Sequence, residues 1–245
     1  APVVFKGAGV LGSAEERGKL AFSGQGNAAG AKVDVRLEAM PLGPARPYLR
    51  GALEPPLVGQ LTADVNVEWQ AGAGAPLKID ARRVALAGLA LGDAKAPELA
   101  AETIEVRDAR IDTSARTAAL GSLRLVGPRL RLDRDADGHW NFARWQASAA
   151  SPPAARAEAP VPPAESASAG ASAAGSGPWR VALGQLALDK GRVAFSDRLP
   201  AAAAALELTD IGAEVKSLAL DTTAPAPFQL SMKVGVPAGP GGRAA

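Results

Sequence analysis

The only residues whose spacing suggests ion chemistry lie in the stretch RLDRDADGHWNF. The order D-x-D-x-D-G, which opens an EF-hand calcium loop, occurs at Asp133, Asp135, Asp137 and Gly138. Such a loop also needs a bidentate Glu at its twelfth position, where this chain has Arg144. Because a cation there would repel the metal, we expect a β-hairpin turn built on Asp-Gly, with calcium binding as the weaker alternative.

No catalytic constellation accompanies this turn. His139 is the only histidine, and the chain has no cysteine with which it could share a metal. The G-x-S-x-G, H-E-x-x-H and G-x-x-x-x-G-K motifs are all missing from the sequence. We therefore expect no enzyme, no cofactor and no metal site. A carbohydrate-active enzyme with paired carboxylates stays open as an alternative, with Trp140 and Trp145 as the aromatic residues to examine.

The composition favours a thin structure over a thick globular core. Hydrophobic residues make up 47% of the 245 residues, but aromatic residues only 4%, and much of the apolar fraction is alanine. The 27 basic and 25 acidic residues are interleaved along the chain, without the concentrated basic stripe that nucleic acids require. No apolar run is long enough for a transmembrane helix, and the first residues do not read as a signal peptide. We expect a segment of a longer protein that carries its targeting and anchoring signals elsewhere.

Strict alternation of apolar and polar residues predicts strands with one dry and one wet face. Residues 59–70 are the clearest case, because Leu61, Val65 and Val67 share a face opposite to acidic and amide side chains. Residues 31–40 repeat the pattern. Between the two, a segment rich in proline and glycine predicts a short helical crossover.

From residue 84 onward the alternation changes phase inside each unit, and the units recur. Val84 and Leu86 give way to Leu89 and Leu91 across Gly88. The same slip occurs across Asp108, and again across Gly127 and Pro128. A bulge or bend restores the facing after such a slip, so each strand is predicted to be long and curved at its middle. A turn is predicted at Lys190-Gly191.

These patterns predict a mostly β fold, an elongated and curved antiparallel sheet folded into a U-shaped trough. Residues 1–146 form its first part and residues 179–245 continue the same sheet. Residues 147–178 are crowded with Ala, Pro, Ser and Gly, so we expect a disordered insertion within one sheet. The segment PAAAAALELTD stays ambiguous, since alanine favours helix and its neighbours are strands.

Four stretches carry a resemblance to a known family. The stretch LRLVGPRLRLDRDADGHWNFARW resembles the AsmA-like proteins of Gram-negative envelopes, in which a strand with an internal Gly-Pro leads into a D-x-D-G turn. The stretches PYLRGALEPPLVGQLTADVNVEW, APLKIDARRVALAGLALGD and PWRVALGQLALDKGRVAFSDRLP are similar to further segments of the branch long labelled as a domain of unknown function. Together they cover most of the chain outside the insertion.

The resemblance implies a periplasmic protein of the cell envelope, usually anchored in the inner membrane by a helix that this chain lacks. It implies a trough-shaped sheet, a link to phospholipid transport between membranes and to outer-membrane homeostasis, and no catalytic residues. Phospholipid or another acyl lipid, the inner membrane and other envelope proteins are the expected partners, and nucleic acid is not.

Our leading hypothesis is that one apolar face of the sheet holds acyl chains. The residues expected to line this groove are Leu61, Val65, Val67, Val84, Leu86, Ile104, Val106, Leu123, Leu125, Val181 and Leu183. For each of them, core packing against a second layer is an equally acceptable explanation. If the sheet closed on itself, the protein would instead be a non-catalytic scaffold of the envelope.

Overall fold

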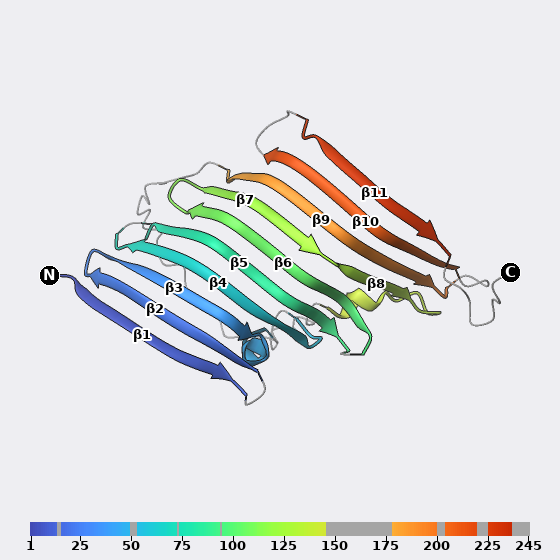
Figure 1. Ribbon diagram of the computed structural model, residues 1–245, viewed down its shortest axis with the longest axis horizontal. Coiled ribbons are helices and arrows are strands. Elements are labelled where there is room, and N and C mark those ends of the chain that lie inside the picture. The colour runs from blue at the N-terminus through green and yellow to red at the C-terminus, as the bar shows by residue number, and fades with distance from the viewer. Residues whose placement is uncertain are drawn as a thin grey trace, which may run out of the picture.

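The fold is one large β-sheet, shown in Figure 1. The structure is a computed structural model, and it describes residues 1–13, 16–49, 53–72, 74–93, 95–145, 178–199, 204–219 and 225–236. The expected disordered insertion, residues 147–178, lies outside the described residues except for Pro178. No helix in the described part of the chain is long and apolar enough to cross a membrane.

Eleven strands make up the sheet. They are β1 (Val3–Gly12), β2 (Arg17–Asn27), β3 (Gly30–Pro41), β4 (Leu57–Gln70), β5 (Leu77–Gly92), β6 (Pro97–Asp112), β7 (Thr117–Val126), β8 (Arg129–Arg134), β9 (Arg180–Asp197), β10 (Ala204–Ala219) and β11 (Phe228–Gly235). The helical elements are η1 (Gly43–Ala45), α1 (Arg46–Leu49) and η2 (Asn141–Arg144). The short helical crossover expected between β3 and β4 is therefore present.

Neighbouring strands are antiparallel throughout except at one place. β9 runs parallel to both β7 and β8, which succeed each other along its length across Gly127 and Pro128. Parallel neighbours need a long connection, and the stretch of sequence between β8 and β9 is long enough for one. The sequence analysis predicted an antiparallel sheet, and this single parallel junction is the exception.

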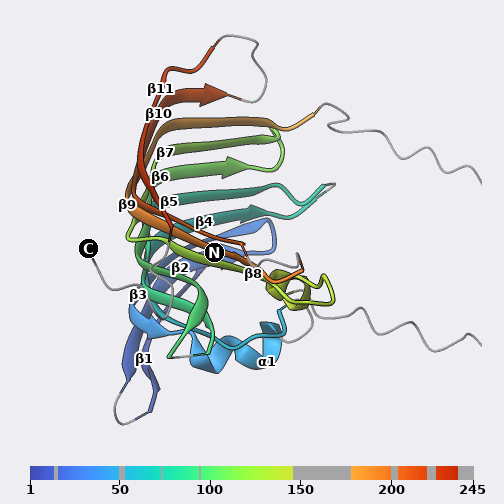
Figure 2. The same cartoon turned by 90° about the vertical axis from the view of Figure 1, so that its right-hand side faces the viewer.

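The sheet is bent into a trough. In Figure 2 the long strands turn so that both of their ends point to the same side, and α1 and η2 lie on that side. We call the enclosed, concave side the inner face and the opposite side the outer face. The U-shaped, mostly β trough predicted from the sequence is therefore confirmed.

Left-handed residues mark the bend. Gly88 (φ 61°), Lys190 (φ 57°) and Asp210 (φ 49°) lie inside strands, and Gly127 (φ 58°) separates β7 from β8. Gly127 and Lys190 are neighbours across the β7–β9 junction, because the amide of Gly127 donates to the carbonyl of Asp189 at 2.8 Å. Left-handed residues and bulges bend strands and increase their twist, so such residues in adjacent strands curve the sheet as a whole.

A second set of irregularities lies further along the strands. Asp108 has φ 53° and Ser217 has φ 55°, and the pairing of β4 with β5 shifts beside Arg82. The predicted phase slips at Gly88, Asp108 and Gly127 thus coincide with left-handed residues. The turn predicted at Lys190-Gly191 is wrong, because β9 continues through it from Arg180 to Asp197. Lys190 is a bulge residue, and a bulge and a turn leave the same local signature in sequence.

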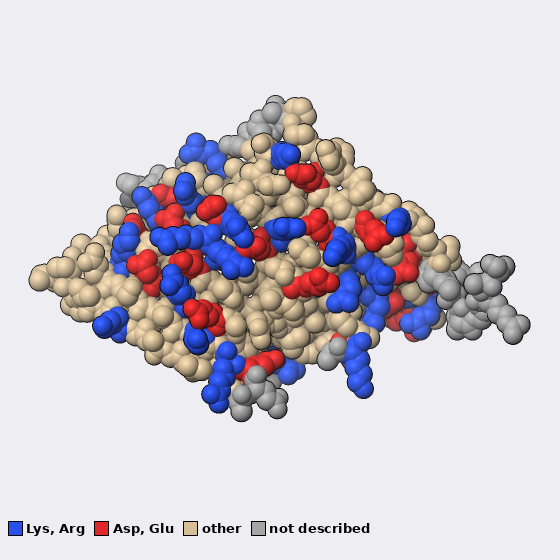
Figure 3. All heavy atoms as spheres, in the orientation of Figure 1, with Lys and Arg blue, Asp and Glu red and all other residues tan. Residues whose placement is uncertain are grey.

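The two sides of the sheet differ in polarity. Figure 3 shows Lys, Arg, Asp and Glu gathered in a band across the face that Figure 1 presents. That face lies to the left in Figure 2, outside the bend. Few side chains are fully buried, and the apolar ones are mostly alanines: Ala63, Ala81, Ala85, Leu89, Leu91, Ala100 and Ala101. Within the described residues, no second sheet covers the inner face, and the short α1 and η2 are the helical elements on that side.

Candidate functional site: the apolar inner face

The charged band in Figure 3 lies on the outer face, so the apolar side of the strands is the inner one. In β4 the two sides alternate without a left-handed residue from Leu61 to Trp69. Leu61, Ala63, Val65 and Val67 therefore share one side. Paired residues of adjacent strands lie on the same side of a sheet, so the register carries this assignment from strand to strand. It does so even where β5 and β6 change phase.

The pairing produces apolar rows that cross the sheet. One row is Met40, Leu61, Leu86, Ile104, Leu125, Leu188, Ala213 and Leu230. The next is Leu37, Ala63, Val84, Val106, Leu123, Leu186, Val215 and Phe228. A third joins Val35, Val65, Ala81 and Ala109. A fourth joins Val33, Val67, Ile79, Ile111, Ala118 and Val181.

All the residues predicted to line a groove lie on this one face. Leu183, which is in none of these rows, pairs with Leu120 and Leu218, and Leu120 shares its side with Ala118. Sequence reasoning missed Met40, Ile79, Ile111, Leu120 and Leu230 as members. Their signal was present, since each continues the alternation of a strand, but the bends hide the continuity of the rows.

The predicted lining residues are all half-buried, neither enclosed nor fully exposed. A core residue packed against a second layer would be almost fully covered. Packing against the neighbouring strands alone accounts for the partial burial. Alanines such as Ala81 and Ala109 interrupt the rows of larger side chains.

The outer face repeats the rows with polar partners. One of them runs through Asp64, Arg83, Arg107, Ser122 and Gln185. Arg83 Nε donates to Glu105 Oε1 at 2.5 Å, and Lys32 Nζ to Glu68 Oε1 at 2.5 Å. Exposed pairs of this kind add little stability each, so their main effect is to keep the outer face wet.

Two groups on this face show how the pairs act. Partial burial alone would raise the pKa of Glu105, but hydrogen bonds and charges from Arg83 and Arg107 lower it below the ordinary value. The hydrogen bond to Glu68 and its charge raise the pKa of Lys32. Both groups are therefore held in their charged forms near neutral pH, as a permanently hydrated surface requires.

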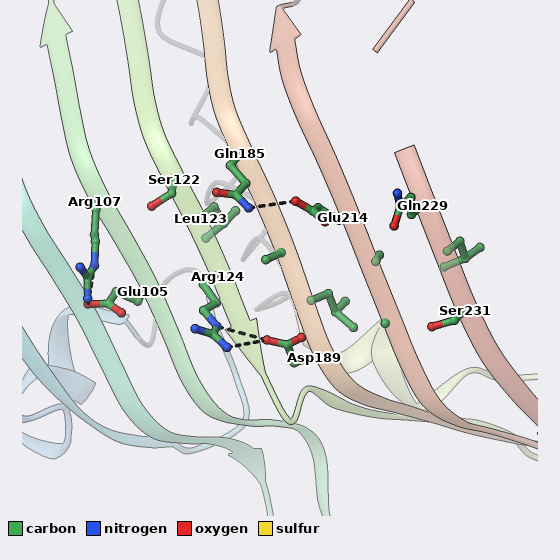
Figure 4. A pocket seen from close by; sticks show the side chains of 15 residues that line it. Glu105, Arg107, Ser122, Leu123, Arg124, Gln185, Asp189, Glu214, Gln229 and Ser231 are labelled. Carbon is green, nitrogen blue, oxygen red and sulfur yellow. Dashed lines mark hydrogen bonds and ion pairs between the residues drawn. The ribbon is translucent and has the colours of Figure 1, made fainter. Parts of the chain in front are cut away.

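A polar depression of about 740 Å³ lies on the outer face between β6 and β11 (Figure 4). Its polar side chains already pair with one another. Arg124 Nη2 donates to Asp189 Oδ2 at 2.9 Å, and Gln185 Nε2 to Glu214 Oε1 at 3.1 Å. These groups leave little unpaired chemistry for a ligand, so we do not assign the depression a role.

The acidic stretch forms the expected hairpin turn. Arg134 pairs with Trp140 in an antiparallel bridge, and Asp135 Oδ1 accepts the amides of Asp137 at 3.0 Å and His139 at 2.8 Å. The hydrogen bond from the His139 amide is the main reason why the pKa of Asp135 is lowered. Carboxylate and imidazole atoms of Asp135, Asp137 and His139 lie within 4.8 Å of one another.

The side chains at two other ligand positions of an EF-hand loop pair with neighbouring residues. The carboxylate of Asp133 pairs with Arg131 at 2.9 Å. Arg144, at the twelfth position, pairs with Glu98. The hairpin interpretation is therefore confirmed, and calcium binding gains no support from the ligand set that an EF-hand needs.

A hydrogen-bonded cluster fastens residues 140–145 to the end of the sheet where β6 begins. Glu98 is only 1% exposed, and its carboxylate accepts hydrogen bonds from Arg144 and from the indole Nε1 of Trp145. Asn141 completes the free edge of β8, with its amide donating to the carbonyl of Arg131 at 2.8 Å and its oxygen accepting from the amide of Asp133 at 3.0 Å. We call this end of the trough, defined by Glu98, Asn141, Arg144 and Trp145, the latched rim.

The aromatic residues of this rim are committed to internal contacts. The Trp140 ring lies 5.5 Å from Phe142 and 6.0 Å from Phe195, with the Arg134 guanidinium 5.5 Å from its centroid. Trp145 is held by Glu98. Neither indole stands free beside a pair of acids, so the carbohydrate-active alternative has no supporting geometry at these residues. Sequence reasoning missed Glu98, whose partners lie far away along the chain.

Comparison of the chain with models of known protein families, with curated proteins and with solved structures found no match.

Proposed function

We propose that the protein handles lipid and holds acyl chains against the inner face of the trough. The observation that carries this proposal is the set of apolar rows that cross the strands on one face, half-exposed and without a covering second sheet among the described residues. An extended apolar surface of this kind on a thin sheet calls for a partner of matching chemistry.

The free energy of burying hydrocarbon sets how much apolar contact the inner face must provide. Burying an acyl chain contributes about 0.8 kcal/mol per CH2, so a chain of about 15 such groups needs on the order of 12 kcal/mol of replacement contacts to leave a bilayer. Rows of Leu, Val and Ile inside a bend offer contacts on more than one side of a guest. Alanines within the rows leave space for it.

The setting of this activity is part of the same proposal. By resemblance to the AsmA-like proteins, the chain would act in the periplasm, as a segment of a larger protein anchored in the inner membrane. There it would serve phospholipid transport between membranes or outer-membrane homeostasis. The proposal needs neither a catalytic residue nor a cofactor.

Lipid loading of paired variants tests the proposal. Leu123 and Ser122 are adjacent but lie on the inner and outer faces, so Leu123→Asp and Ser122→Asp place one negative charge on either side of the same strand. After detergent exchange with dioleoyl phosphatidylglycerol, native mass spectrometry should show lipid on the wild type and on Ser122→Asp. Loading of Leu123→Asp should fall at least tenfold.

A photo-crosslinker provides a second readout that adds no charge. Placed at Val65 or Leu86, it should capture lipid, and circular dichroism should show each variant folded. Folded, lipid-free wild type with no crosslinked lipid at either residue contradicts the proposal.

The scaffold alternative is favoured by one separate observation. β1 and β11 are open edges of the sheet, and Val4, Phe228 and Val234 on them are more than 60% exposed. Open edges accept further strands, which is how a scaffold would recruit partners. Lipid-free protein that assembles through these strands would support this alternative over lipid handling.

A further inference from the structure

The tryptophans and the single tyrosine all lie near strand ends. Trp69 is the penultimate residue of β4, Trp179 directly precedes β9, Tyr48 is in α1, and Trp140 and Trp145 flank η2. None of them occupies the apolar rows in the middle of the sheet. Indole rings favour boundaries where one side is apolar and the other is wet.

Two of these tryptophans belong to the rim opposite the latched one. Trp69 is 41% exposed and Trp179 is 46% exposed. Each lies two residues from a member of one apolar row, Val67 or Val181. By alternation, the Trp69 indole projects on the inner face at its boundary with solvent, and continuing the alternation of β9 one residue before its start places the Trp179 indole on the same face. We call this end of the trough, defined by Trp69, Leu77 and Trp179, the open rim.

Arg180 places a cation beside Trp179. It pairs with Thr117 in a row of the outer face, but it is the first residue of β9, so its long side chain starts at the very end of the strand and can reach around the rim toward the inner face. Among the described residues, the exposed side chain of Arg180 makes no ion pair. Two other cations of the same row are neutralised, Lys32 by Glu68 and Lys78 by Asp112.

We propose that Trp179 and Arg180 bind the phosphate-bearing headgroup of the lipid whose acyl chains lie on the inner face. This inference rests on the proposed function and adds to it the orientation of the lipid and the residues that bind its headgroup. Arg180 would donate charge-assisted hydrogen bonds to the phosphate, for which a guanidinium is well suited. Trp179 would lie at the ester level, with its ring on the apolar side and its N–H toward water.

The dimensions agree with one leaflet of a bilayer. Half of a hydrocarbon core of about 30 Å is about 15 Å. A strand advances about 3.3 Å per residue. A headgroup at Trp179 therefore places the end of an acyl chain that spans one leaflet four to five residues along β9, near Leu183. Val181 and Leu120 would line its path, and both face inward.

Two lipids that differ only in the headgroup test this inference. Dioleoyl phosphatidylglycerol and dioleoylglycerol are loaded separately onto wild type, Arg180→Ala and Arg180→Lys. We expect Arg180→Ala to lower phosphatidylglycerol loading about tenfold, the scale of one hydrogen bond to a charged group. Loading of dioleoylglycerol should stay unchanged, and Arg180→Lys should retain part of the phosphatidylglycerol loading.

Arg82→Ala is the matched control, because Arg82 is also an exposed cation but lies in the middle of β5. It should leave both lipids unaffected. Unchanged phosphatidylglycerol loading in Arg180→Ala overturns the inference and leaves the proposed function standing. Loss of both lipids overturns it as well, since the effect would then be on the fold.

Two further outcomes separate the sources of failure. Wild type that loads neither lipid contradicts the proposed function itself. Inorganic phosphate that binds the lipid-free chain through Arg180, while lipid loading ignores the substitution, would identify a free-anion site and overturn the headgroup assignment.

Discussion

The two rims of the trough use the same residue types in opposite ways. At the latched rim, Trp145 donates its indole N–H to a carboxylate that is 1% exposed, and Trp140 packs among aromatic rings. At the open rim, Trp69 and Trp179 are 41% and 46% exposed, and no described residue stacks on either indole or accepts a hydrogen bond from it. One end is closed by the chain's own contacts, while the other leaves amphipathic groups for a guest.

This difference indicates that the latched rim contributes to stability and the open rim to binding. A buried acceptor with charged and indole donors holds residues 140–145 in place, and removing it leaves polar groups without partners. Exposed indoles contribute little to folding and much to binding once they are desolvated. Substitutions at the latched rim should therefore change the free energy of unfolding, and those at the open rim should change lipid loading.

The strongest test of the comparison is Glu98→Ala. It removes the acceptor of Arg144 and Trp145, and we expect unfolding free energy to fall by about 1–3 kcal/mol. Glu68→Ala is the matched control near the open rim, where it removes an exposed pair with Lys32 that adds little stability, so its loss should be clearly smaller. Urea denaturation measures both. Equal losses would mean that the two rims do not differ in the way described.

A second change acts on the bend that separates the rims. Gly88 has φ 61°, and a Cβ built there meets nothing within 4 Å. Gly88→Ala should therefore cost about 1–2 kcal/mol through backbone strain alone. Ala87→Gly, the neighbouring control outside the left-handed region, should behave as an ordinary strand glycine and cost about 0.5–1 kcal/mol. Thermal unfolding distinguishes the two, and a neutral Gly88→Ala would contradict the strain argument.

The opposite substitution should stabilise the same bend. Lys190 adopts φ 57° with a side chain that makes no ion pair among the described residues. Lys190→Gly should relieve the strain and raise the unfolding free energy by about 0.5–1 kcal/mol, part of the gain being lost to the flexibility of the unfolded chain. Arg192→Gly, two residues further on, replaces a residue that already has ordinary strand geometry. It should therefore lower the free energy of unfolding. A loss of stability in Lys190→Gly would show that the left-handed position is not strained.

The open rim should be the least sensitive to substitution. Trp69→Ala should change unfolding free energy by no more than about 0.5 kcal/mol, as expected for an exposed position without special contacts. Trp145→Phe, which keeps a ring but removes the N–H donor, should cost about 1 kcal/mol. Chemical denaturation gives both values. A larger loss in Trp69→Ala than in Trp145→Phe would reverse the comparison.

Acidification should change the stability of the protein least, and it should act at a turn beside the open rim. The hydrogen bond from Ser114, followed by one from the Ala115 amide, lowers the pKa of Asp112 below its ordinary 3.8. The contribution of Asp112 to the free energy of unfolding is therefore complete above pH 3.8. It is lost as the pH falls through the lowered pKa that the carboxyl has in the folded protein. NMR titration of the Ala115 amide should show a midpoint below 3.8, and Asp112→Asn should abolish the step. A midpoint above 3.8 would contradict the assignment.

Much of the fold could be predicted because residues close together in the sequence determine each strand and its bends. Alternation over residues 59–70 predicts β4, and each phase slip at Gly88, Asp108 and Gly127 reports a residue that must leave the β region. The same logic failed at Lys190-Gly191, where a glycine after a polar residue suggests a turn. Only the pairing of β9 with its neighbours shows that the strand continues.

Other features depend on partners distant in the chain. β1 and β11 were not predicted, because β1 is interrupted by glycines and β11 is short and stands at the edge. The parallel pairing of β9 with β7 leaves no mark in either sequence. Glu98 reads as a surface charge until the fold brings Arg144 and Trp145 to it. The lining residues were predictable as a face, whereas the assignment of Trp179 and Arg180 to one rim needed the register.

Spin labels on adjacent residues test the central claim most directly, since the chain has no cysteine of its own. Leu86→Cys and Ala87→Cys place one label on the inner face and the other on the outer face of β5. After loading with phosphatidylglycerol, the label at position 86 should gain oxygen accessibility and lose access to a water-soluble nickel relaxant, as in hydrocarbon, while the label at 87 stays wet. Two labels that remain equally accessible to water, with lipid present, would contradict a hydrocarbon-filled trough.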